Sequence, residues 1–122
     1  MAAKSVLLIE DNLPLAAGLQ ACLESQGYQV VHALEGQEAL DACRERIPYL
    51  VVTDVLMKTM DGLSFLKHLR ALPGGRDVPV VVISGVTQQG IFDEMRALGV
   101  RRFLIKPFSL EDFLNIVGEA IG

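Results

Sequence analysis

The sequence predicts a three-layer, doubly wound α/β domain in which five parallel strands alternate with five helices. Five short strand-like runs are separated by segments of helical periodicity along the 122 residues. Three of the runs are continuously apolar, as expected for strands buried on both faces of a sheet, and they cover residues 6–9, 49–52 and 80–83. Repeated alternation of strands and helices requires right-handed crossovers, which place helices on both faces of a parallel sheet.

Each element has its own signal in the spacing of apolar residues. Strands are expected to start near Val6, Val30, Tyr49, Val80 and Arg101. Four of the intervening segments carry an apolar stripe at helical spacing. The stripes contain Leu15, Leu19, Cys22 and Leu23; Leu63, Leu66, Leu69 and Leu72, widened by Phe65; Ile91, Met95 and Leu98; and Leu110, Phe113, Leu114, Val117 and Ile121.

The residues at the ends of these segments agree with this order of elements. Asn12 and Pro14 form a typical helix start, with the proline in the first turn. Gly27 and Gly99 are placed to end helices just before strands. Ser109, with an acid three residues later, resembles a capping box at the start of the last helix. We expect one domain over residues 1–122.

Composition excludes several classes of protein. Hydrophobic residues make up 51% of the chain and charged residues 21%, which rules out disorder. The longest apolar runs have four residues, whereas a membrane-spanning helix needs about 20, and no signal peptide is found. The formal net charge of -4 argues against direct contact with nucleic acid. Cys22 and Cys43 are too few for a disulfide framework, so we expect reduced core thiols in a cytoplasmic protein.

Polar side chains end four of the five predicted strands. Glu10 and Asp11 end the first strand, Asp54 the third, Ser84 the fourth and Lys106 the fifth, whereas the second offers nothing comparable. The carboxyl ends of parallel strands meet at one edge of the sheet, where α/β proteins bind ligands. Each acid taken singly is most simply a helix cap or a solvated residue. The joint pattern on one edge favours a functional site.

The residue types at this edge suggest phosphoryl chemistry. If the strand order is 2-1-3-4-5, the two strands that end in acids are neighbours, and their three carboxylates repel one another. An oxygen-only ligand set without Cys or His suits Mg²⁺, for which Mn²⁺ could substitute. A metal, a lysine and a hydroxyl around one carboxylate form a receptor for a phosphoryl group, with that carboxylate as the nucleophile.

Together, these residues resemble the receiver domain of two-component response regulators, the CheY-like family. The resemblance covers essentially the whole chain, with Ser84 placed 30 residues after Asp54 and Lys106 placed 22 residues after Ser84. It implies the flavodoxin-like strand order 2-1-3-4-5. The matching segments are LLIEDN (7–12), ALEGQEAL (33–40), DVLM (54–57) followed by MDG (60–62), VISG (82–85) and FLIKPF (103–108).

The resemblance implies a role for each acid. Asp54 would be the phosphoacceptor that attacks the phosphohistidine of a sensor histidine kinase or histidine phosphotransfer protein. Asp11 would bind Mg²⁺ directly, and Glu10 would support it, through water. Leu56 would offer its main-chain carbonyl oxygen to the metal. The protein would be a signalling phosphoacceptor that assists its own phosphorylation and dephosphorylation, not an enzyme.

The resemblance also implies a switch. Ser84 and Lys106 would bind phosphoryl oxygens, and the peptide bond between Lys106 and Pro107 would be cis. Phe103 would move inward as Ser84 closes on the phosphate, with Gly85 leaving space. The face made by the fourth helix, fifth strand and fifth helix would then change its affinity for an output partner that the sequence does not identify. A monomer or a phosphorylation-dependent dimer is expected.

Three alternatives were compared with this interpretation. A Mg²⁺-dependent phosphohydrolase would need a second acid two residues after Asp54, where Leu56 stands. A flavin-binding module of the flavodoxin type would need a phosphate loop after the first strand, where the acids would repel phosphate. A receiver domain cut from a larger regulator would have the same sequence, although the initial Met1 favours a single-domain regulator or a phosphorelay intermediate. The sequence names no cognate kinase or pathway.

Some positions depart from the family pattern. Lys58 stands where the family usually has proline, and it is either a solvated loop residue or a source of positive potential beside the site. Leu56 and Val86 are apolar where neighbouring side chains are often polar, which predicts slower hydrolysis of the phosphoryl group. Phe103 lacks the hydroxyl of the commoner tyrosine. Phe92 is expected to be a packing residue.

Overall fold

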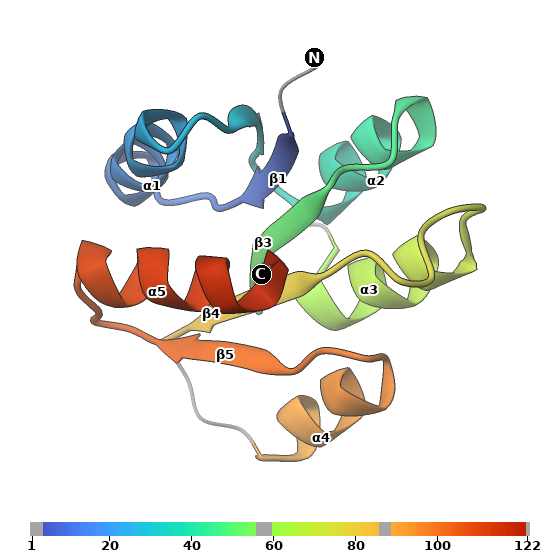
Figure 1. Ribbon diagram of the computed structural model, residues 1–122. Coiled ribbons are helices and arrows are strands. Elements are labelled where there is room, and N and C mark those ends of the chain that lie inside the picture. Colours follow the sequence, from blue (N-terminus) through green and yellow to red (C-terminus); the bar gives the residue numbers. More distant parts are fainter. Residues whose placement is uncertain (1–3, 56–59, 86–88, 122) are drawn as a thin grey trace.

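The computed structural model describes residues 4–55, 60–85 and 89–121. In this part of the chain five strands and five helices alternate (Figure 1). The strands are β1 (Ser5–Ile9), β2 (Gln29–Ala33), β3 (Leu50–Asp54), β4 (Val80–Ser84) and β5 (Arg102–Ile105). The helices are α1 (Leu13–Ser25), α2 (Gly36–Glu45), α3 (Gly62–Ala71), α4 (Gln89–Ala97) and α5 (Leu110–Ile121).

All five strands are parallel, and their order is β2-β1-β3-β4-β5. This confirms the predicted fold class and strand order. Helices α1 and α5 cover one face of the sheet, and α2, α3 and α4 cover the other (Figure 1). The sheet is therefore the middle of three layers, and the acidic strands β1 and β3 are neighbours.

Each face of the sheet has its own hydrophobic core, because successive side chains of a strand point to opposite faces. Along β1, Val6 and Leu8 pack with α1 and α5, whereas Leu7 and Ile9 pack with the three helices on the other side. Strands β3 and β4 are buried along their whole length, as their continuous apolar sequences predict. The central strands thus hold the residues at their carboxyl ends in fixed positions.

The helix ends confirm the expected caps. The Asn12 side chain accepts a hydrogen bond from the Leu15 amide at the start of α1, and Ser109 Oγ accepts one from the Asp112 amide before α5. Gly27 and Gly99 have positive φ angles of 90° and 89°, which glycine adopts without steric cost.

Differences from the sequence-based expectations are small. Strands β1, β2, β3 and β5 begin one residue away from the expected positions. In α1 the side chain of Ala16 is buried, whereas Leu15 is only half-buried, so the buried face of the helix includes Ala16 beside Leu19 and Leu23. Phe92 is buried and packs against Phe103, with ring centroids 4.9 Å apart, which confirms its packing role.

Both cysteines are free thiols within helices. Cys43 lies in the core and Cys22 is half-buried. Burial raises the pKa of the Cys43 thiol to about 11, as expected for an inert core residue. None of the helices in the described ranges is both long and apolar enough to cross a membrane.

Candidate functional site

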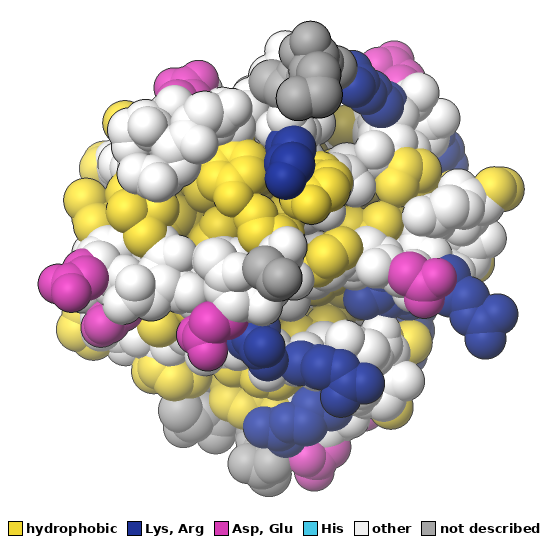
Figure 2. Space-filling view, viewed as in Figure 1, with side chains coloured by type: hydrophobic (Ala, Val, Ile, Leu, Met, Phe, Trp, Pro, Cys, Tyr) yellow, Lys and Arg dark blue, Asp and Glu magenta, His cyan; other side chains and the backbone are white. Residues whose placement is uncertain are grey.

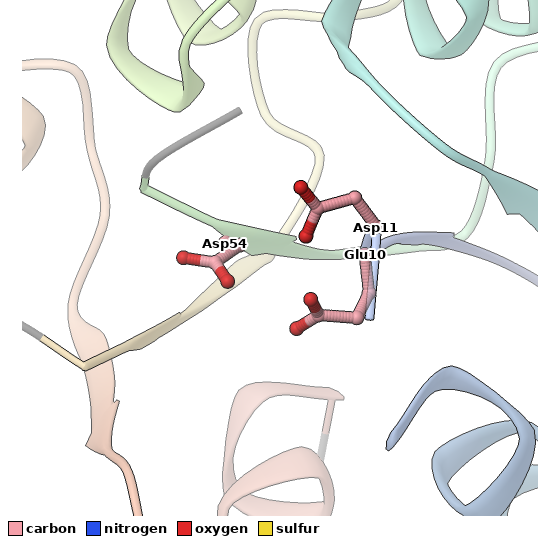
Figure 3. Close-up of side chains that lie close together, drawn as sticks. All are labelled: Glu10, Asp11 and Asp54. Carbon is pink, nitrogen blue, oxygen red and sulfur yellow. The ribbon is translucent and has the colours of Figure 1, made fainter. Parts of the chain in front are cut away.

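Three carboxylates meet where β1 and β3 end. One carboxylate oxygen from each of Glu10, Asp11 and Asp54 lies within 4.8 Å of the other two. Figure 3 shows Glu10 and Asp11 projecting from the end of β1 beside Asp54 at the end of β3. Glu10 and Asp54 are buried, whereas Asp11 is exposed. The cluster is therefore accessible from one side and closed on the other.

Among the residues that the structure describes, Lys106 supplies the positive charge nearest to the two buried acids. Its Nζ lies 2.6 Å from Oδ2 of Asp54 and 3.1 Å from Oε1 of Glu10. Its position follows from β5, because the Lys106 amide extends the pairing with β4 by donating to the carbonyl oxygen of Ser84 at 2.7 Å. The Lys106–Pro107 peptide bond is cis, the isomer that the family resemblance implies. Three carboxylates and one ammonium leave the cluster with excess negative charge.

Main-chain amides stabilise the two buried carboxylates. Oδ1 of Asp54 accepts a hydrogen bond from the Val55 amide at 2.6 Å, and Oε2 of Glu10 accepts one from the Asn12 amide at 3.1 Å. Burial raises the pKa of Glu10 above its usual value; the hydrogen bonds from Asn12 and Lys106 oppose this rise, and the charge of Asp54 adds to it. The net effect of the site is to make the ionised form of Glu10 less favourable.

The pKa of Lys106 responds in the opposite way to its surroundings. Burial alone would lower it, but hydrogen bonds and charge attraction from Asp54 and Glu10 raise it above the usual value for lysine. Lys106 is therefore a fixed cation at neutral pH. This agrees with the charge that the sequence analysis assigned to it.

Sequence reasoning missed two residues behind the cluster. His32 of β2 donates from Nε2 to the carbonyl oxygen of Glu10 at 2.8 Å, so β2 does contribute to this edge of the sheet. The buried Thr53 hydroxyl donates to the carbonyl oxygen of Asp54 at 2.9 Å. The available signal was a polar residue next to the apolar residues of each strand, His32 in β2 and Thr53 in β3. Both contacts restrain the backbone that carries the acids.

Ser84 and Phe103 lie on the neighbouring strands. Ser84 ends β4, where it is buried, and its Cα pairs with Ile105 of β5. Phe103 is half-buried on β5, between the ring of Phe92 and the guanidinium of Arg96, whose central carbon lies 5.0 Å from the ring centroid. The sequence singled out Ser84, Lys106 and Phe103, and the sheet places all three on its β4–β5 side.

The residues that the structure brings together fit a hard divalent cation. Their donor atoms are carboxylate oxygens, which Mg²⁺ prefers, and the excess negative charge needs a counterion. Glu10, Asp11 and Asp54 could hold the ion. The expected main-chain ligand Leu56 lies outside the described residues, as do Lys58 and Val86.

The family profile of the response regulator receiver domain matches residues 6–118 of the chain. The polar-differentiation response regulator DivK of Brucella ovis is 29% identical over 119 residues, which cover 98% of this chain and 97% of the relative. The chemotaxis protein CheY4 of Vibrio cholerae superposes with a TM-score of 0.91 at 27% identity and covers 98% of this chain and 99% of that structure.

A third similar protein has a metal in the corresponding fold. The receiver domain of the sensor histidine kinase PA1611 from Pseudomonas aeruginosa has a TM-score of 0.88 and 28% identity, over 99% of both chains, and its structure contains a magnesium ion coordinated in the active site cleft. The family profile, the fold and the acidic cluster agree with one another. The chain therefore belongs to the response regulator receiver domain family, whose members are signalling phosphoacceptors rather than classical enzymes.

Proposed function

We propose that Asp54 accepts a phosphoryl group from the phosphohistidine of a sensor histidine kinase or a histidine phosphotransfer protein. The observation that carries the proposal is the 2.6 Å contact between Lys106 Nζ and Asp54 Oδ2, within a cluster that also contains Glu10 and Asp11. A carboxylate next to a fixed cation and two further acids suits aspartyl phosphorylation better than structural pairing, since one cation does not neutralise three acids.

In the proposed reaction, an Asp54 carboxylate oxygen forms a bond to phosphorus as the bond between phosphorus and the histidine nitrogen breaks. The electron pair of the broken bond stays on that nitrogen, and the imidazole, which already carries a proton on its other nitrogen, leaves as the neutral ring. Mg²⁺, held by Asp11, Asp54 and the supporting Glu10, would neutralise charge on the phosphoryl oxygens. Lys106 moves from the carboxylate to a phosphoryl oxygen, and the Ser84 hydroxyl donates to another.

Phosphorylation is proposed to change the surface formed by α4, β5 and α5. Ser84 and Lys106 belong to paired ends of β4 and β5, and Phe103 lies three residues before Lys106 on β5. Closure of Ser84 on the phosphoryl group would therefore act directly on the strand that carries Phe103. A change in population from 1:99 to 99:1 needs a preference of about 5.5 kcal/mol for the active state.

The proposal includes a cytoplasmic location, a histidine kinase or phosphotransfer protein as phosphodonor, and an output partner that binds the α4–β5–α5 surface. The protein would be either a monomer or a dimer that forms on phosphorylation.

The test is intact mass spectrometry after incubation with a small-molecule phosphodonor and Mg²⁺. The native protein should gain one phosphoryl group, and Asp54→Asn should gain none. Asp41→Asn, which changes an exposed acid of α2, should behave like the native protein. Addition of a chelator should abolish the gain. An unmodified native protein, or an equal gain in Asp54→Asn, would overturn the assignment of Asp54 as phosphoacceptor.

A further inference from the structure

A cavity of about 310 Å³ opens at the end of the sheet opposite to the acidic cluster. Val80, at the start of β4, lines this cavity, whereas Ser84, at the other end of the same strand, lies on the side of the acidic cluster. Four arginines from three segments surround the cavity, together with one acid. They are Arg70 of α3, Arg76, Arg101 and Arg102 near the starts of β4 and β5, and Asp77.

This concentration of positive charge is unusual for an acidic chain. Four of the 11 basic residues line one cavity, although the formal net charge of the protein is -4. Figure 2 shows dark blue side chains gathered over the region where α4 leads into β5. Arginine keeps its proton throughout the physiological pH range. With Asp77 ionised, the lining of the cavity has a clear excess of positive charge.

No carboxylate of the described residues forms an ion pair with these arginines, although the nearby charge of Asp77 partly offsets that of Arg70. Two exposed arginines elsewhere form ion pairs, Arg44 with Asp41 and Arg96 with Asp93. Within the described ranges, none of the four arginines of the cavity forms such a pair. Nε of Arg102 is buried and has no hydrogen-bond partner among the described residues. A buried donor without an acceptor costs free energy, and a shift of the Arg102 side chain toward an anion in the cavity would relieve that cost.

Arg70 gives the cavity a rigid guanidinium. Its Nε donates to the carbonyl oxygen of Leu98 at 2.8 Å, and its Nη1 donates to those of Gly75 and Val78 at 3.0 and 2.7 Å. Its Nη2 lies beside Gly99, where a Cβ atom would be 3.6 Å away. Because residue 99 is glycine, no side chain at this position shields Nη2 of Arg70 from the cavity. Three carbonyl contacts thus hold one donor group in a fixed orientation.

We propose that this cavity binds a small molecule with a phosphate-type headgroup that carries at least two negative charges. Guanidinium groups bind phosphate oxygens through paired hydrogen bonds, and here they come from several segments around one space. The volume is near the lower end of the range for small-molecule sites, about 300–1,000 Å³. Val78, Pro79 and Ala120 supply an apolar wall for the uncharged part of the ligand. The site is separate from the proposed phosphorylation site.

Inorganic pyrophosphate is the probe for the test, added to the native protein in the presence of a chelator and followed by amide NMR shifts. Saturable shifts should centre on Val78, Val80 and Gly99. Arg102→Gln and Arg76→Gln should each weaken binding by about tenfold. Arg44→Gln, which changes an exposed arginine of α2, should leave binding unchanged. Arg76 is exposed, so its substitution should leave the fold intact even if Arg102→Gln unfolds the protein.

Three results of the pyrophosphate titrations would overturn the proposal. They are shifts that do not saturate, an equal loss of affinity in Arg44→Gln, and shifts centred on Glu10, Asp54 and Lys106. A polyglutamate peptide serves as competitor. Displacement of pyrophosphate by polyglutamate at lower concentration would mean that the cavity receives an acidic protein segment, contrary to the proposal. Failure at this site leaves the phosphorylation of Asp54 untouched, because that reaction is measured separately by mass.

Discussion

The ammonium group of Lys106 bridges Asp54 and Glu10, with Nζ 2.6 Å from Oδ2 of Asp54 and 3.1 Å from Oε1 of Glu10. These three residues come from the ends of β3, β1 and β5, so the bridge joins three strands at the edge of the sheet. The Glu10 side chain is fully buried and that of Lys106 is 26% exposed. The bridge offsets repulsion between two carboxylates that the fold forces together.

Removal of the ammonium group should destabilise the protein at neutral pH. In Lys106→Met the two buried carboxylates lose their shared cation, so we expect a loss of about 1–3 kcal/mol in the free energy of unfolding. The loss should be smaller at pH 5 than at pH 7, because the raised pKa of Glu10 favours its protonated form as the pH falls, and a protonated Glu10 no longer repels Asp54. Urea denaturation at the two pH values measures both effects. Lys67→Met, an exposed change in α3, is the control, and an unchanged stability of Lys106→Met at pH 7 would contradict the prediction.

Stabilisation by Mg²⁺ should increase as the pH rises. Burial raises the pKa of Glu10, so its protonated form favours the folded state, and this contribution is lost as the pH rises through the raised value. Protons and Mg²⁺ compete for the cluster, so the metal should raise the melting temperature little at about pH 5 and more at about pH 8. Thermal unfolding with and without Mg²⁺ tests this. An increase in melting temperature that is the same at every pH would refute the competition.

The acidic cluster could be predicted from sequence, but its internal contacts could not. Asp54 ends β3, one residue after a continuous apolar run, and parallel strands bring their carboxyl ends together, so the position of Asp54 near Glu10 follows from topology. The hydrogen bond from His32 depends on the register of the edge strand β2 and on one ring rotamer. The anchoring of Arg70 depends on three carbonyl oxygens in loops, which apolar periodicity does not describe.

Gly62 should be intolerant of any side chain. A Cβ atom there would lie 2.5 Å from the carbonyl oxygen of Asp54, and the Gly62 amide donates to the carbonyl oxygen of Val55. Gly62→Ala should therefore displace the backbone of the acidic cluster and destabilise the protein by about 1–3 kcal/mol. Gly18→Ala is the matched control, since no atom lies within 4 Å of a Cβ at that position of α1.

Gly18→Ala should stabilise the protein by about 0.5–1 kcal/mol, because alanine loses less backbone entropy in a helix. Chemical denaturation of both variants gives the comparison. Equal effects of the two substitutions would show that the contact with Asp54 does not restrict residue 62.

The half-buried ring of Phe103 should be held in place by Arg96. The central guanidinium carbon of Arg96 lies 5.0 Å from the ring centroid, while the ring of Phe92 packs at 4.9 Å with a 45° angle between planes. Cation–π contacts contribute about 0.5–1 kcal/mol at partly exposed sites. Any movement of Phe103 in the proposed switch must overcome this attraction, which is about a tenth to a fifth of the roughly 5.5 kcal/mol that full switching requires.

A double-mutant cycle with Arg96→Gln and Phe103→Leu isolates the contact. The Arg96 side chain also pairs with Asp93 at 3.0 Å, but that loss is present in both backgrounds and cancels. The cycle should give a coupling free energy of about 0.5–1 kcal/mol from urea denaturation. Additive effects would mean that Arg96 does not restrain Phe103. If the coupling is present, Arg96→Gln should also alter the affinity for the output partner more in the unphosphorylated protein than in the phosphorylated one. In the phosphorylated protein the ring of Phe103 has already moved away from Arg96, so the substitution removes no contact there.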